Sequence, residues 1–151
     1  MLFPRDTMKN KGGLENEPKE IPWKVIVKTL TTTRGVDKVF DFFANMKNME
    51  IGGAIQSMEK GEDGWWTFEH SVAGKSRMKH TLSREFGIID HIFIGDGLEW
   101  KVFVRVVPNQ KGSTTTWTFM RPDGLSDGQF EDQLKMFDTE IDHWKTALEN
   151  T

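Results

Sequence analysis

The chain has no cysteine and no tyrosine among its 151 residues. Without cysteine it can form no disulfide bond and no thiolate metal site, and this composition fits a reducing cytoplasm. Long apolar runs are absent as well, so no segment reaches the length of a membrane span, and the first residues show no signal-peptide pattern. We therefore expect a cytoplasmic protein with no stable membrane insertion.

An excess of basic charge is also missing. The 20 Lys and Arg residues are outnumbered by 23 Asp and Glu residues, which gives a net charge of −3. This balance argues against nucleic acid as the main partner. The sequence contains no Walker, His-Glu-x-x-His or Gly-x-Ser-x-Gly motif. Accordingly, the sequence predicts no cofactor.

A long amphipathic helix is predicted over residues 126–149. Ser126 is expected to cap its start, with Gln129 completing a capping box. Its apolar residues recur at steps of four and three, the spacing of one helix face: Phe130, Leu134, Phe137, Ile141, Trp144 and Leu148. The chain's 11 Phe and 6 Trp indicate a large apolar interior. Because the preceding sequence reads mainly as strands, we expect the helix to lie on the inside of a curved sheet.

The start of the chain divides at residue 22. Residues 1–22 are polar and rich in turn formers and form a predicted tail, whereas residues 23–151 form one predicted domain. The first predicted strand, 23–30, alternates apolar residues with Lys24 and Lys28. This alternation predicts that Trp23, Val25 and Val27 form the buried face.

The rest of the domain reads as short helices and a succession of strands. Short helices are predicted at 36–44 and 45–51, from apolar residues at helical spacing. Tight turns such as Asp63-Gly64 then separate strands that alternate in polarity. Six further strands are predicted: 54–60, 65–72, 75–84, 88–94, 98–107 and 113–121. Successive strands with tight turns form an antiparallel meander that must curl to bury one face.

This order of elements resembles the helix-grip fold of the SRPBCC superfamily, which includes START lipid-transfer domains, birch-pollen-allergen-like proteins, polyketide cyclases and activators of chaperone ATPases. The resemblance covers about residues 23–149. It rests on the element order, on Phe40-Asp41-Phe42-Phe43 after the first strand and on the closing helix. Segments 85–91 and 121–125 are similar to a cyclase/dehydrase-like subgroup. The resemblance implies an α+β fold in which a seven-stranded curved antiparallel sheet wraps around the long C-terminal helix, with two short helices after the first strand.

A cavity between sheet and helix that holds a hydrophobic small molecule is a further implication of the resemblance. The sequence pattern supplies the candidate ligand-binding residues, which are the side chains expected to face inward from the strands and from the helix. They are Trp66, Phe68, His70, Met78, His80, His91, Phe93, Trp100, Trp117, Phe119, Phe130, Leu134, Phe137 and Ile141. The pattern alone also fits an ordinary packed core, since apolar stripes of period two are typical of cores.

Three histidines fall on three successive predicted strands. If a turn near Phe86 joins two of these strands, His80 and His91 lie nearly opposite each other, roughly 5 Å apart at Cβ. They are the candidate catalytic residues, as a proton-transfer pair, and ligand anchors are a second functional interpretation, although hydrogen-bonded wall residues are the commoner role of such histidines. His70 is expected too far along its strand to complete a metal site, so no metal is predicted. Asp90 is expected to point away from His91, because neighbours on a strand face opposite sides.

Three functions follow from this interpretation, and whether the protein is an enzyme stays open. The first is binding of a lipid, polyketide or aromatic compound in the cavity. The alternative is a polyketide cyclase/dehydratase-like enzyme that uses cavity histidines as acid and base. The second alternative is a protein-interaction module of the chaperone-ATPase-activator type, which a filled core and an exposed apolar patch would favour. The cavity mouth is expected near the helix start and the turns at Gly52-Gly53, Gly95–Gly97 and Gly124.

Overall fold

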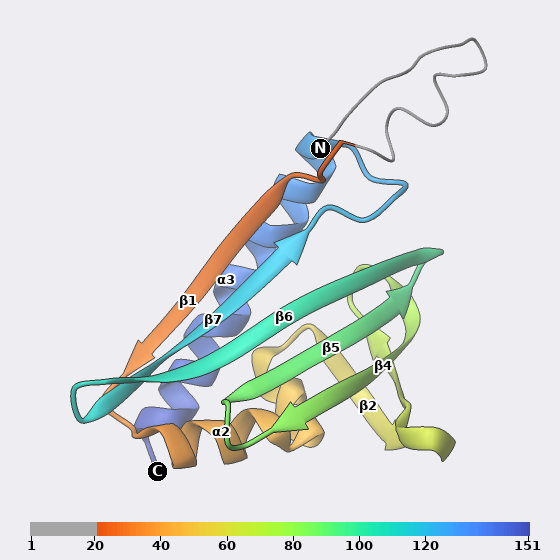
Figure 1. Ribbon diagram of the computed structural model, residues 1–151. Coiled ribbons are helices and arrows are strands. Elements are labelled where there is room, and N and C mark those ends of the chain that lie inside the picture. The colour runs from red at the N-terminus through yellow and green to blue at the C-terminus, as the bar shows by residue number, and fades with distance from the viewer. Residues whose placement is uncertain (1–20) are drawn as a thin grey trace, which may run out of the picture.

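Residues 21–151 are described in the computed structural model of the protein, and the first 20 residues of the predicted tail lie outside this range. Figure 1 shows a curved sheet against one long helix. The described strands are β1 (Val25–Thr32), β2 (Ile55–Lys60), β3 (Trp66–His70), β4 (Gly74–Ser83), β5 (Ile88–Gly95), β6 (Leu98–Asn109) and β7 (Gly112–Met120). The described helices are α2 (Val36–Ala44), the 3-10 helices η3 (Met46–Gly52) and η4 (Glu62–Gly64), and the long α3 (Asp127–Glu149).

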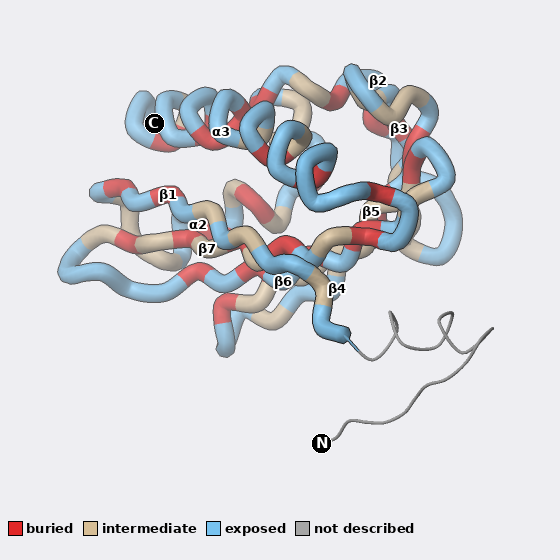
Figure 2. The backbone as a smooth tube through the Cα atoms, turned by 90° about the horizontal axis from the view of Figure 1, so that it is seen from above, coloured by how far each residue is buried: buried red, intermediate tan, exposed pale blue. Residues whose placement is uncertain are grey.

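The strands form one antiparallel sheet in the order β1-β7-β6-β5-β4-β3-β2. Hairpins and tight turns join β2 through β7 in sequence, whereas β1 lies beside β7, where Val25 pairs with Met120 and Thr32 with Ser113. Between β1 and β2 the chain passes through α2 and η3, from one edge of the sheet to the other (Figure 1). Figure 2 shows α3 covering one face of the sheet. The predicted seven strands, two short helices and closing helix are therefore confirmed.

The buried face of β1 is the opposite of the predicted one. Val25 and Val27 are 49% and 52% exposed, whereas Leu30, which faces the helix side, is 2% exposed. Lys24 and Lys28 share that side, where their ammonium groups lie 2.8 Å from carboxylate oxygens of Glu131 and Asp138 on α3. A lysine can lay its carbon chain along an apolar surface and keep its charge at the edge. The prediction was therefore wrong by one residue in the alternation, and a shift of one residue moves every side chain of a strand to the opposite face of the sheet.

The start of α3 is fixed by its own side chains. Ser126 Oγ accepts a hydrogen bond from the Gln129 backbone N–H at 3.1 Å, and the Ser126 N–H donates to Gln129 Oε1 at 2.9 Å. This is the predicted capping box, which satisfies two backbone donors that the first turn would otherwise leave unpaired. It orients the buried face of α3, whose Phe130 is fully enclosed.

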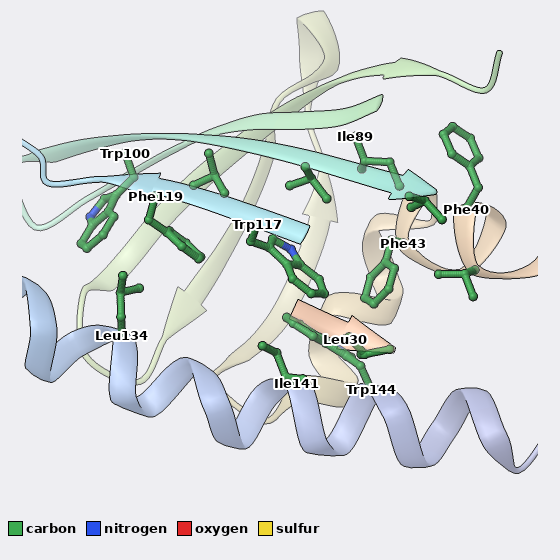
Figure 3. Close-up of a cluster of buried hydrophobic side chains, with 14 of the residues drawn as sticks. Leu30, Phe40, Phe43, Ile89, Trp100, Trp117, Phe119, Leu134, Ile141 and Trp144 are labelled. Carbon is green, nitrogen blue, oxygen red and sulfur yellow. The ribbon is translucent and has the colours of Figure 1, made fainter. Parts of the chain in front are cut away.

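Aromatic rings from three elements fill the space between the sheet and the second half of α3. Phe43 of α2 packs edge-on against Trp117 of β7 and Trp144 of α3, with ring centroids 5.3 and 5.5 Å apart. Trp117 and Trp144 stack on each other at 5.9 Å. Figure 3 shows these rings together with Leu30 and Ile141. This part of the interior is a packed core.

Candidate functional site

A cavity of about 130 Å³ lies between the concave face of the sheet and α3. Its wall is mainly apolar and includes six aromatic residues from β5, β6, β7 and α3: Phe93, Trp100, Trp117, Phe119, Phe137 and Trp144. Polar side chains interrupt this wall at His70, His91, Asp96, Gln133 and Glu140. An apolar enclosure with a few polar groups is the usual form of a small-molecule site.

Most of the candidate residues from the sequence reach this cavity. His70, Met78, His91, Phe93, Trp100, Trp117, Phe119, Leu134 and Phe137 line it. His80 does not; it lines a separate space of only about 20 Å³, whose wall also includes His91. Both histidines face inward, but only His91 can meet a ligand in the larger cavity.

Four other candidates are part of packed clusters and do not line the cavity. Phe68 belongs to a second buried cluster, and Trp66 packs against it. Phe130 packs against Trp100 with ring centroids 5.9 Å apart, and Ile141 is buried in the main core. Alternation and helical spacing identify the side of an element that faces inward, but they do not tell a cavity wall from its packed surroundings.

The edge of the cavity is formed by turns and by one face of α3. Val72, Asp96 and Met136 line the cavity and are exposed, so the opening lies between the β3–β4 turn, the β5–β6 turn and α3. The predicted mouth included the β5–β6 turn at Gly95–Gly97. Gly95 lets β5 lie close to the paired strand β4 at this edge, because a Cβ there would lie 2.3 Å from Ser76 Oγ.

His70 is held in one tautomer by the turn that follows it. Its Nδ1 accepts hydrogen bonds from the backbone N–H groups of Val72 and Ala73, both at 3.1 Å. A nitrogen that accepts two hydrogen bonds carries no proton, so Nε2 is the protonated nitrogen of the neutral ring. Burial lowers the pKa of His70, and the two donors facing Nδ1 also oppose its protonation. The ring therefore offers one N–H donor through Nε2.

His80 and His91 are direct partners across β4 and β5, as the sequence predicted. Burial, with a smaller contribution from the neighbouring His80, lowers the pKa of His91 to about 4, although a hydrogen bond with the Ile89 backbone acts in the opposite direction. Burial, together with the nearby Lys60 charge, also lowers the pKa of His80. His91 is thus neutral at pH 7. Within residues 21–151, no three His, Asp or Glu side chains are grouped so that they could hold a metal ion.

Asp90 occupies a break in the pairing of β5 with β6. Its Oδ1 accepts a hydrogen bond from the Val104 backbone N–H at 2.8 Å. The side chain therefore replaces a backbone acceptor of the ladder, and it does not support His91.

Glu140 is the functional candidate that the sequence reading missed. It is 9% exposed and lines the cavity, and burial raises the pKa of its carboxyl to about 7. No hydrogen bond or ion pair joins this carboxyl to another residue in the described part of the chain. The signal was present in the spacing, because Gln133, Phe137, Glu140 and Trp144 follow one another at steps of four, three and four. Gln133 and Glu140 therefore lie along one edge of the apolar face, in line with its Phe137 and Trp144.

Comparison with known proteins identifies the fold. No protein-family model and no curated protein matches the chain. The crystal structure of Ara h 8.0201 matches with a TM-score of 0.66 at 15% identity, covering 85% of this chain and 99% of that one. The chain has the helix-grip fold. Zhui aromatase/cyclase from Streptomyces sp. R1128 matches with a TM-score of 0.67 at 13% identity, covering 83% of this chain and 93% of that one.

An uncharacterized protein from Bacillus thuringiensis has the same helix-grip architecture, with a TM-score of 0.69 at 9% identity over 83% of this chain and 98% of that one. These structures confirm the helix-grip fold that the sequence predicted. Identities this low establish the fold alone, so function must be argued from the site. In the described residues, no helix combines the length and the apolar character needed to cross a membrane.

Proposed function

We propose that the protein binds a hydrophobic small molecule in the cavity between the sheet and α3. The observation that carries this proposal is the aromatic wall around an unfilled space of about 130 Å³. Apolar surface gains free energy when it is removed from water. A ligand that fills this space would cover the aromatic wall that now faces it.

The size of the cavity limits the ligand. In another protein, an apolar cavity of roughly 150 Å³ encloses one benzene ring. A cavity of about 130 Å³ therefore encloses one aromatic ring or a short acyl segment, and a longer ligand extends through the opening at Val72, Asp96 and Met136. This favours a compact aromatic ligand over a lipid with two long chains.

The cavity also favours ligand binding over the interaction-module alternative, because that alternative predicted a filled core.

Catalysis is a second candidate function, because Glu140 and His91 line the same cavity. A carboxyl whose pKa is raised to about 7 can donate or accept a proton near neutral pH. The Zhui structure belongs to an aromatase/cyclase, which supports this candidate by analogy of fold.

The tryptophans provide a site-resolved test of ligand binding. Trp100, Trp117 and Trp144 line the cavity, whereas Trp23 and Trp65 lie outside it with the guanidinium groups of Arg121 and Arg77 over their rings. NMR spectra of indole N–H groups, assigned with single Trp→Phe variants, are recorded during titration with indole or naphthalene. We expect saturable shifts for the three wall tryptophans and none for the outer two.

A cavity-filling variant and a matched control complete the test. Val102 lines the cavity and is 2% exposed, so Val102→Phe should weaken binding at least tenfold. Val25→Phe makes the same change on the outer face of the sheet, where Val25 is 49% exposed, and should leave binding unchanged. Equal shifts for wall and outer tryptophans, or equal binding by both variants, would reject the proposed site.

A further inference from the structure

We propose that the preferred ligand is an organic cation, a protonated amine on a compact apolar body, and that Glu140 is its counter-ion. This inference rests on the proposed function, namely that the cavity binds a small hydrophobic molecule. It adds the chemical class of the ligand and assigns a role to the carboxyl that the sequence did not reveal.

Among the described residues, the charged groups of the cavity are all acidic. Glu140 lines its interior and Asp96 its exposed edge, and no Lys or Arg of residues 21–151 is part of the wall. The wall histidines do not offset these charges, because burial lowers the pKa of both His70 and His91. A ligand carboxylate would meet only charges of its own sign there, whereas an ammonium group would meet opposite charge.

The carboxyl of Glu140 lacks the cation or the hydrogen-bond donors that a buried acid normally has. Burial without a partner opposes ionisation, and burial is the cause of the raised pKa of Glu140. Most buried carboxylates are paired with a cation or with several donors. Within residues 21–151 this one has neither, so a cation brought by the ligand would supply the missing partner.

A nearby donor can assist the ionised form. Gly52 has no side chain, and a Cβ at that position would lie 3.0 Å from both Glu140 Oε2 and Trp144 Cε2. These two atoms are therefore at most about 6 Å apart. The indole N–H of Trp144 is attached to that carbon and is buried without a hydrogen-bond partner among the described residues. It is available to the Glu140 carboxylate once a bound cation draws the carboxyl into its charged form.

The aromatic wall also favours a cation. Six aromatic rings line the cavity, and the negative face of an aromatic ring attracts a positive charge, most strongly where water is excluded. The Nε2–H of His70 is a donor that an ammonium group cannot satisfy. It is suited to a hydroxyl or ether oxygen elsewhere on the same ligand.

Four probes with one apolar body and different head groups test the inference: 2-phenylethylamine, 2-phenylethanol, phenylacetate and ethylbenzene. Binding at pH 7.5 is measured by calorimetry and by the indole N–H shifts of the wall tryptophans. We expect the amine to bind at least tenfold more tightly than the alcohol, and phenylacetate to bind most weakly. In Glu140→Gln the ratio of amine to alcohol affinity should fall to about one.

Asp142→Asn is the matched control, since it removes one negative charge from an exposed position of the same helix. This variant should keep the preference for the amine. Equal affinity for the amine and the alcohol, or a preference for the amine that persists in Glu140→Gln, would overturn the counter-ion role. In either case, binding of the neutral probes would still support the proposed function. Failure of all four probes to shift any wall tryptophan would overturn both.

Discussion

Replacing Glu140 by Gln should stabilise the protein at high pH and leave its stability unchanged at low pH. The buried carboxyl has its pKa raised from 4.5 to about 7, so the folded chain holds this proton more tightly than the unfolded chain. The resulting stabilisation is fully present below pH 4.5 and is lost as the pH rises to about 7. At 1.36 kcal/mol per pH unit, the loss amounts to about 3 kcal/mol. Gln keeps the shape of the side chain and has no charge to bury.

The assay is denaturant and thermal unfolding of parent and variant at a series of pH values from 4 to 8.5. At pH 4 the two should be equally stable, and at pH 8 Glu140→Gln should be more stable by up to about 3 kcal/mol, or roughly 6–12 °C in Tm. The histidines titrate in both proteins, so their effects cancel in the difference. Asp142→Asn should show no comparable gain. A difference between parent and Glu140→Gln that does not change with pH, or a variant less stable at pH 8, would refute the description of Glu140 as a buried carboxyl without a partner.

Three further substitutions test other parts of the structure by the same unfolding measurements. Burial lowers the pKa of His91 to about 4, so its contribution to stability is present above pH 6.5 and is lost on acidification. The stability of His91→Gln relative to the parent should therefore be about 2 kcal/mol higher at pH 4.5 than at pH 7.5, and a difference independent of pH would contradict this. Gly52→Ala would place Cβ 2.9 Å from Trp144 Cζ2 and should cost about 1–3 kcal/mol, whereas an unchanged stability would mean that the Trp144 ring moves freely. Ser126→Ala removes the acceptor of the Gln129 N–H and should cost about 1 kcal/mol at any pH.

The sequence predicted the order of strands and helices because each element has a strong local signal. Alternating polarity from Leu98 onward, tight Gly turns and the capping box at Ser126 each depend on a few neighbouring residues. The pairing of β1 with β7 and the burial of individual side chains depend on distant residues. In β1 both faces carry apolar residues, and the buried face is the one whose Ile26 and Leu30 pack into the core formed with distant parts of the chain.

The candidate site was predicted in outline for the same reason. Strand alternation identified His70, His91 and the strand residues of the aromatic wall, since these side chains share one face of the sheet. Glu140 was not among the predicted site residues because a charged residue on a helix is usually exposed, although its position beside Phe137 and Trp144 indicated otherwise. Whether a polar residue next to the apolar face of a helix is buried depends on how much of the helix the rest of the protein covers. In this fold, η3 and Gly52 extend that surface around the side of α3.

The position of β1 at the edge beside β7 has a consequence for how the chain folds. Val25 cannot find its partner Met120 until nearly the whole domain has left the ribosome. Contacts between such distant residues close large loops, and proteins dominated by them fold slowly. During synthesis, β1 would have its hydrogen-bonding groups and the apolar side chains of Ile26 and Leu30, which pack into the core of the folded domain, open to other strands. Residues 112–151, which contain all of β7 and α3, therefore determine when these groups are covered.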